Sequence, residues 1–162
     1  MQRTLLFLVL FASLLVILST GSRLPEVVGS HFDDSGHAVS SMARGHFIAL
    51  MAALAVGVPL LIRLPAGLVA RHARLNVPHA EYWNAPEQRP AVVRYLTAWT
   101  SGLSIAMCLF LTAIFVLVVR AHAGNPPQME MGSMAMLLLA FLGYGGLASL
   151  HLVRFFRRVP RA

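Results

Sequence analysis

The stretch LPEVVGSHFDDSGHAVSSMARG, residues 24–45, is the one polar segment in the front half of a very apolar chain. Pro25 fixes a bend near its start, and residues 27–32 (VVGSHF) are rich in β-type side chains. Residues 33–36 (DDSG) have turn chemistry, in which glycine can take a positive φ. Residues 37–40 can then return as a second strand. The segment therefore predicts a short β-hairpin between two apolar helices.

The composition around this segment predicts an integral membrane protein. The 162 residues are 57% hydrophobic and only 12% charged, whereas about a quarter of a soluble domain is charged. The net charge of +7 arises from 13 basic residues, all of them arginine. They stand at the ends of apolar runs, which favours membrane orientation over nucleic-acid binding. The single cysteine, Cys108, allows neither an intrachain disulfide nor a cysteine-based metal motif.

Four apolar runs predict an all-α membrane domain with four transmembrane helices. We expect the spans at about residues 3–21, 43–63, 98–120 and 133–153. Loops 22–42, 64–97 and 121–132 connect them, and residues 154–162 form the tail. The first run also has features of a signal peptide, with Arg3 before a short apolar core. We favour a retained helix, because three more spans follow.

The helix boundaries have candidate capping residues. Ser40 or Ser41 can cap the start of the second span. Asn84, with Glu87 three residues later, predicts the start of a helix that continues into the third span. Arg63 ends the second span, where a long side chain can extend to the membrane interface.

The distribution of arginine predicts that both termini are cytoplasmic. The inner side then carries Arg3, the arginines of loop 64–97 (Arg63, at its border, Arg71, Arg74, Arg89, Arg94) and those of the tail (Arg154, Arg157, Arg158, Arg161). The outer side carries Arg23, Arg44 and Arg120. The reverse orientation would violate the positive-inside rule. Residues 24–45 are therefore expected outside.

Histidine and methionine in the expected outer loops are candidates for a metal site. The candidate ligands are His31, His37, His122, Met129 and Met131. Imidazole suits zinc or copper, and thioethers suit Cu(I). Their spacing matches no tight signature, so solvated histidines beside a methionine-rich helix start are the favoured interpretation. We predict no metal and no cofactor.

Catalytic and transport signatures do not emerge from the sequence. The apolar runs carry no charged residue that would mark an ion path. A nucleophile–base pair, a triad and a phosphate loop are also not evident, so the sequence favours a non-enzymatic protein. His79, Tyr82 and Trp83 gather in the inner loop, where histidine can act as a base or ligand. An interfacial turn with aromatic side chains at the headgroups is the favoured interpretation.

Small residues recur at helical spacing on two of the spans. Ala49, Ala53 and Gly57 follow one another every four residues, and Gly145 and Ser149 form a second pair. Such stripes let another helix approach closely. The neighbouring helix can belong to the same bundle or to a partner.

Two segments resemble a bacterial family. Leu24-Pro25, Val28, His31-Phe32 and Gly36 form an "LP…V…HF…G" pattern. This pattern resembles the loop of membrane proteins with domain of unknown function 1648, the domain found in SdpI-type toxin-immunity proteins. Residues 76–83 (NVPHAEYW) and 85–87 (APE) resemble a second segment of shorter members. The resemblance implies a multi-pass protein of the bacterial inner membrane. In the SdpI branch it also implies protection against a secreted membrane-active toxin and capture of a regulator.

The leading functional hypothesis is a non-enzymatic membrane protein that recognises a peptide, a toxin or a partner protein. The expected outer binding residues are Leu24, Pro25, His31, Phe32 and Gly36, and the inner ones are His79, Tyr82 and Trp83. One alternative is an accessory subunit of a larger membrane complex. Another is an extracytoplasmic metal-handling protein that uses the His/Met cluster. Membrane lipid and a membrane protein or peptide are the expected partners, and nucleic acid is not.

Overall fold

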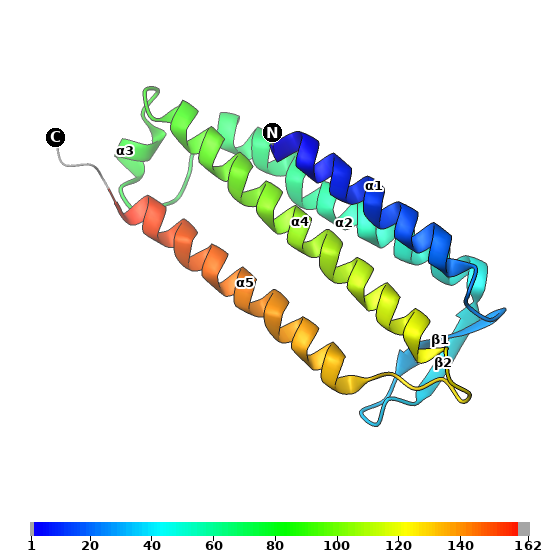
Figure 1. Cartoon of the computed structure of the whole chain (residues 1–162). Coiled ribbons are helices and arrows are strands. Elements are labelled where there is room, and N and C mark those ends of the chain that lie inside the picture. The colour runs from blue at the N-terminus through cyan, green and yellow to red at the C-terminus, as the bar shows by residue number, and fades with distance from the viewer. Residues whose placement is uncertain (1, 159–162) are drawn as a thin grey trace.

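The computed structural model describes residues 2–158, without the side chains of residues 2, 3, 65–67, 70 and 71. Its elements in chain order are α1 (Gln2–Gly21), β1 (Val27–Phe32), β2 (Ala38–Ala43), α2 (Arg44–His72), α3 (Ala80–Asn84), α4 (Arg89–Ala121) and α5 (Met131–Arg157). The long helices run side by side (Figure 1). The hairpin of β1 and β2 lies at one end, whereas α3 and the beginning of α1 lie at the other.

Four helices of the described chain are long and apolar enough to cross a membrane: Thr4–Gly21, Arg44–Leu64, Arg89–Ala121 and Met131–Arg157. The expected four apolar helices, with a hairpin between the first two, are thus confirmed and are compatible with a multi-pass membrane protein. Helix α2 continues to His72, beyond the expected end of the span at residue 63. Helix α4 begins at Arg89, before the expected residue 98. Hydropathy locates the apolar window and not the ends of the helix, and α2 continues past its window even through Pro65.

The core lies between α1, α2 and α4, while α5 packs chiefly along α4. The main cluster of buried side chains comprises Ile17, Leu24, Val28, Phe47, Met51, Ala55, Phe115, Val118, Ala121 and Met129. Phe47 of α2 stacks on Phe115 of α4 with ring centroids 5.9 Å apart. In contrast, only Phe156 is buried among the 27 residues of α5.

A row of buried polar side chains runs along the inner face of α4. Ser101, Ser104 and Cys108 lie three and four residues apart, so they share one helix face. Ser104 Oγ donates a hydrogen bond of 2.8 Å to the Pro59 carbonyl of α2. Cys108 Sγ donates one of 3.1 Å to Ser13 Oγ of α1. These small side chains therefore join α4 to both neighbours at short range.

The hairpin is antiparallel, with Val28 paired to Met42 and register irregularities after Gly29. At its turn, Asp33 Oδ1 accepts hydrogen bonds from Ser35 N (2.9 Å), Ser35 Oγ (2.7 Å) and His37 N (2.9 Å). The Ser35 hydroxyl, followed by the His37 amide, holds the pKa of the Asp33 carboxyl below its usual value. The predicted hairpin is confirmed, although its second strand extends to Ala43 rather than ending at residue 40.

Both predicted helix caps are wrong. Ser40 and Ser41 lie within β2, and α2 begins after Ala43 without a side-chain cap. Asn84 ends α3 and does not start α4. Its side-chain amide binds the backbone of Leu75 at both ends, through Leu75 N to Oδ1 (2.8 Å) and Nδ2 to Leu75 O (2.9 Å). This paired contact across the loop competes with a local cap.

The described arginines lie at the two ends of the bundle, with more of them at the end that holds α3. The end with α3 holds Arg63, Arg74, Arg89, Arg94, Arg154, Arg157 and Arg158, and the hairpin end holds Arg23, Arg44 and Arg120. Arg161 and the side chains of Arg3 and Arg71 lie outside the described part. The charge asymmetry on which the predicted orientation rests is therefore an asymmetry between the two ends of the helices.

Candidate functional site

The hairpin docks on the loop between α4 and α5 through His122. The Gly29 amide donates a hydrogen bond of 2.9 Å to His122 Nε2. On the other side of the ring, His122 Nδ1 lies 2.8 Å from the Val118 carbonyl oxygen. Because Nε2 accepts and Nδ1 must donate, the imidazole is neutral with its proton on Nδ1. His122 thus joins the hairpin to the end of α4.

The predicted outer binding residues divide into packed and exposed ones. Leu24 is only 2% exposed, and the Phe32 ring meets the His122 ring edge-on at 6.3 Å. Gly36 has φ +85°, and a Cβ at this position would collide with the Met129 carbonyl oxygen. Its own carbonyl accepts a hydrogen bond of 2.8 Å from Met129 N.

Pro25 and His31 remain on the surface of the hairpin. Four of the six residues of the "LP…V…HF…G" pattern, Leu24, Val28, Phe32 and Gly36, are therefore packed where the hairpin is seated. Only Pro25 and His31 of the pattern are accessible to a ligand.

The candidate metal ligands lie on the hairpin and on the segment from the end of α4 to the start of α5. His31 Nδ1 lies 2.8 Å from Ser40 Oγ, and His37 Nδ1 lies 2.8 Å from Ser35 Oγ. Met129 is buried under the hairpin, and Met131 begins α5. Within the part of the chain that the structure describes, no three His, Cys, Asp or Glu side chains are grouped so as to hold a metal ion. A site that also uses the methionine thioethers stays a prediction.

At the opposite end of the molecule, α3 packs against the last turn of α5. Trp83 is buried, and its Nε1–H donates a hydrogen bond of 2.9 Å to the Phe156 carbonyl. Tyr82 meets the Trp83 ring edge-on at 4.9 Å. His79 is exposed and has the left-handed backbone conformation, with φ 54°. Of the predicted inner residues, Tyr82 and Trp83 are thus brought together in packing, whereas His79 is exposed and lines an open recess of about 460 Å³ together with Tyr82.

Further along, three large side chains fasten α5 to α4. Trp99 Nε1 donates a hydrogen bond of 2.8 Å to the Ala148 carbonyl, and the Tyr95 hydroxyl lies 2.7 Å from His151 Nδ1. Phe110 stacks on Phe141 with ring centroids 4.4 Å apart. Most of the other residues of α5 are exposed, including Leu139, which is 68% exposed.

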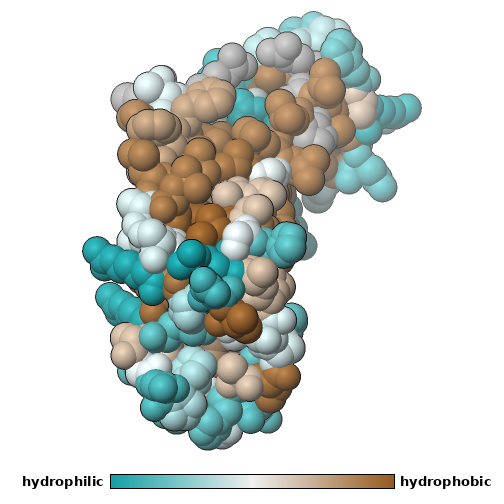
Figure 2. All heavy atoms as spheres, turned by 90° about the vertical axis from the view of Figure 1, so that its right-hand side faces the viewer, coloured by the Kyte–Doolittle hydropathy of each residue, from teal (hydrophilic) through white to brown (hydrophobic). Residues whose placement is uncertain are grey.

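An apolar groove of about 470 Å³ lies between α1, α4 and α5. Its lining includes Val16 of α1, Ala113, Val116 and Arg120 of α4, and Ser133 and Leu137 of α5. Arg120 and Ser133 are its polar residues near the hairpin end, together with Thr112 further along. The view from the hairpin end (Figure 2) shows hydrophilic side chains over the hairpin and an apolar surface over the helices.

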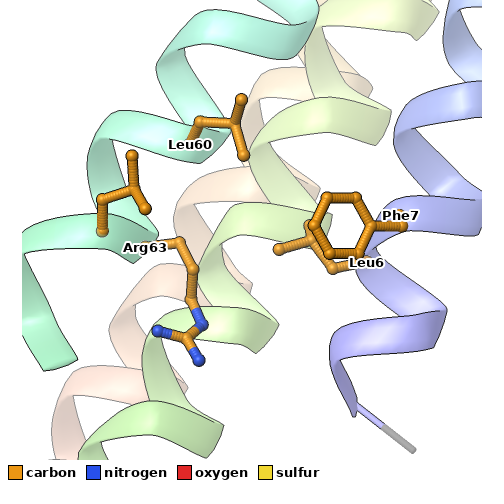
Figure 3. Close-up of a pocket in the computed structure, with 5 residues that line it drawn as sticks. Leu6, Phe7, Leu60 and Arg63 are labelled. Atoms are coloured by element: carbon orange, nitrogen blue, oxygen red, sulfur yellow. The ribbon is translucent and has the colours of Figure 1, made fainter.

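A second apolar recess, of about 310 Å³, lies between α1 and α2, and its lining includes one cationic side chain, that of Arg63. Leu6, Phe7, Leu60 and Arg63 line it (Figure 3). Arg63 Nε donates a hydrogen bond of 2.9 Å to Ser101 Oγ of α4. Arg63 was expected at the end of the span with its side chain extended to the interface. Its link to Ser101 was missed, because a lone serine in an apolar run gives no sign of its partner.

The small-residue stripes do not face a neighbouring helix within the described chain. Ala49 and Ala53 are exposed on α2, and Ser149 is exposed on α5. A Cβ added at Gly57 or Gly145 would have no neighbour within 4 Å. Close packing of these stripes against a helix of another molecule stays a prediction.

Together these features define a small bundle of four long apolar helices with one docked hairpin and an open side along α5. No family model, no curated protein and no solved structure matches the chain. The resemblance to proteins with domain of unknown function 1648 therefore rests on the two quoted segments and stays a prediction.

Proposed function

We propose that the chain is a non-enzymatic multi-pass membrane protein that binds a membrane-embedded helix of a partner polypeptide in the groove between α1, α4 and α5. The observation that carries the proposal is the poor burial of α5, in which only Phe156 is buried. The other three long helices share a common core, and α5 shares only a seam with α4. The groove is the side of α5 on which another helix would complete the packing.

The energetics of membranes support a helix as the occupant. In lipid, helices associate through close van der Waals fit and interhelical hydrogen bonds, since burying apolar surface gives little gain there. The groove offers both a concave apolar wall and polar groups at Thr112, Arg120 and Ser133. Arg120 would pair with an acidic residue at the end of a partner helix, near the membrane surface. These groups select a helical segment with a polar end over a plain acyl chain.

The resemblance described above suggests a narrower form of the same function. An SdpI-like protein would hold a membrane-active toxin or a regulator, and its exposed Pro25 and His31 would contact the part of the ligand outside the membrane. A partner that stays bound permanently would make this chain an accessory subunit. We place the protein in a bacterial inner membrane with the arginine-rich end inside, in accord with the positive-inside rule.

Site-specific photo-crosslinking in intact membranes tests the groove. A photoreactive residue at Leu137, which lines the groove, is expected to give a discrete adduct with another polypeptide. The same residue at Phe11 of α1, which is 62% exposed and does not line the groove, is expected to give lipid adducts only. Ala113→Trp fills the groove and should abolish the Leu137 adduct, whereas Leu18→Trp on the exposed face of α1 should preserve it.

The result also identifies the occupant. A Leu137 adduct made only of lipid, or one unaffected by Ala113→Trp, would overturn the proposal. An adduct with a second copy of the chain would replace partner binding by self-association. The stoichiometry of the purified adduct distinguishes a permanent subunit from a transient ligand.

Labelling of introduced cysteines tests the orientation. Val39→Cys in the hairpin and Glu87→Cys before α4 are suited, because both residues are exposed. Position 36 is unsuitable, since a side chain there would collide with Met129. We expect an impermeant reagent added outside intact cells to label position 39 and not position 87. The opposite pattern would contradict the proposed topology.

A further inference from the structure

A third recess lies where α5 ends beside α3, at the far end of the molecule from the hairpin. It has a volume of about 390 Å³ and is lined by Trp83, His151, Arg154, Phe155 and Arg158. None of these residues lines the groove of the proposed function. The inference that follows is therefore independent of it.

One wall of this recess is a fixed aromatic surface. The Trp83 ring is held by its hydrogen bond to the Phe156 carbonyl. Phe155 stacks on Trp83 with ring centroids 4.8 Å apart and on Tyr95 with centroids 3.7 Å apart. These contacts hold the aromatic wall of the recess in place.

The other wall carries cationic and hydrogen-bonding groups. Arg154 lies in the last turn of α5 and Arg158 is its C-cap residue, and both side chains line the recess. Both are exposed, and among the described residues neither guanidinium forms an ion pair with a carboxylate. His151 Nδ1 is occupied by the Tyr95 hydroxyl at 2.7 Å. The Nε2 atom of His151 is therefore the ring nitrogen left to bind a ligand.

These side chains are suited to bind the oxygen atoms of a phosphate group. Guanidinium groups bind phosphate with paired, charge-assisted hydrogen bonds. The C-terminal end of α5 has a partial negative charge of about half an elementary charge, which repels an anion. The two guanidinium charges outweigh it. The recess thus has a net preference for an anion despite its place at a helix C-terminus.

We propose that the recess binds the phosphate of an anionic phospholipid headgroup. Leu150 and Val153 precede the arginines on α5 and are exposed, so acyl chains can lie along the helix while the phosphate stays with Arg154 and Arg158. Tryptophan is enriched at the depth of the headgroups, and basic pockets beside transmembrane helices are known headgroup sites. A soluble phosphate ester would use the same polar groups but would gain nothing from the apolar side of α5.

Lipid titration of the purified full-length chain in detergent tests this site. The probes are dioleoyl phosphatidylglycerol, dioleoyl phosphatidylcholine and inorganic phosphate, with tryptophan fluorescence and native mass spectrometry as readouts. We expect phosphatidylglycerol to bind saturably and at least about tenfold more tightly than phosphatidylcholine. The double variant R154Q/R158Q should weaken this binding at least about tenfold.

The matched control is the double variant R74Q/R94Q. Arg74 and Arg94 are exposed at the same end of the bundle, so this variant loses the same charge without touching the recess. It should change the affinity by less than about threefold. Equal weakening by both variants would show diffuse attraction to a basic surface and overturn the site. Binding of inorganic phosphate as tightly as phosphatidylglycerol would overturn the lipid assignment in favour of a soluble phosphate ester. Should R154Q/R158Q fail to fold, equal binding of the two lipids by the unmodified chain would still refute the proposal.

Discussion

The bundle of α1, α2 and α4 and the single helix α5 are built on different principles. The three-helix bundle is joined by small buried groups, with Ser104 bonded to the Pro59 carbonyl and Cys108 to Ser13. Helix α5 is held at intervals by large aromatic side chains from α3 and α4, two of which donate to its backbone carbonyls. Small side chains let two helix axes lie close together along their length. Large aromatic side chains hold two helices farther apart and leave space on either side of each contact.

The comparison shows that two helices that are both apolar enough to cross a membrane can be packed very differently. The window of α4 that can cross a membrane and that of α5 both meet the length and hydropathy of a span. Yet α4 is buried at Thr100, Ser101, Ser104 and Cys108, and α5 is buried only at Phe156. Hydropathy therefore marks which helices can enter lipid, and the placement of small polar groups decides which of them pack closely.

The largest effect is expected in the core of the three-helix bundle. Phe115 is fully buried and stacks on Phe47, so Phe115→Ala should leave a cavity and cost about 3 kcal/mol of unfolding free energy. Leu139→Ala on α5 is the control and should cost less than about 0.5 kcal/mol. Thermal unfolding in mild detergent measures both. Similar losses at the two positions would show that α5 is covered as well as the bundle is.

A smaller loss is expected where the hairpin meets the loop before α5. Gly36→Ala puts a Cβ against the Met129 carbonyl at a positive φ, which should cost about 2 kcal/mol. Gly45→Ala is the matched control, because nothing lies within 4 Å of a Cβ there. Amide hydrogen exchange should show faster exchange across both strands in the first variant alone. Unchanged protection would mean that the hairpin holds without its contact to Met129.

Removing one of the aromatic contacts that hold α5 should lower the free energy of unfolding only modestly. Trp83→Phe keeps most of the ring but leaves the Phe156 carbonyl without its donor, at a cost of about 1 kcal/mol. We expect the end of α5 to move away from α3 while the three-helix bundle is unchanged. Spin-label distances between α3 and α5, with a pair on α2 and α4 as reference, measure this. A change in the reference pair would contradict the independence of the two regions.

The smallest effect concerns the pH dependence of the hairpin turn. Hydrogen bonds from Ser35 and His37 lower the pKa of the Asp33 carboxyl, so the folded turn favours the ionised form. Its contribution is complete above the ordinary pKa of about 4 and is lost as the pH falls through the lowered value. The Ser35 amide resonance should therefore show a titration step in acidic solution, below the ordinary carboxyl pKa of about 4. Asp33→Asn should remove that step, and a transition near neutral pH would point to another group.

The chain pattern was sufficient for the helices and the hairpin, because length, hydropathy and turn chemistry are local properties. The turn at residues 33–36 and the four apolar helices followed from short stretches of sequence. The predicted caps failed for a different reason. Asn84 bonds to Leu75 across a loop, and such a pairing of distant groups has no local signature.

The site could be predicted only in part for the same reason. Phe32, Gly36, Tyr82 and Trp83 were singled out by their pattern, but the structure gives them packing partners that are remote in sequence: His122, Met129 and Phe156. The sequence indicates only that Arg154 and Arg158 belong to an arginine-rich tail. Their position beside Trp83 depends on how α3 folds back on α5. Periodicity does not reveal this arrangement.

The bond between Gly29 and His122 has a consequence for the order of assembly. Residues 24–45 are synthesised long before His122 and Met129, so the hairpin emerges without the surface on which it docks. It can dock only after α4 and the loop that follows it have been made and lie at the same end of the bundle. The docking of the hairpin is therefore a late step of folding, and it reports that the two halves of the chain have come together.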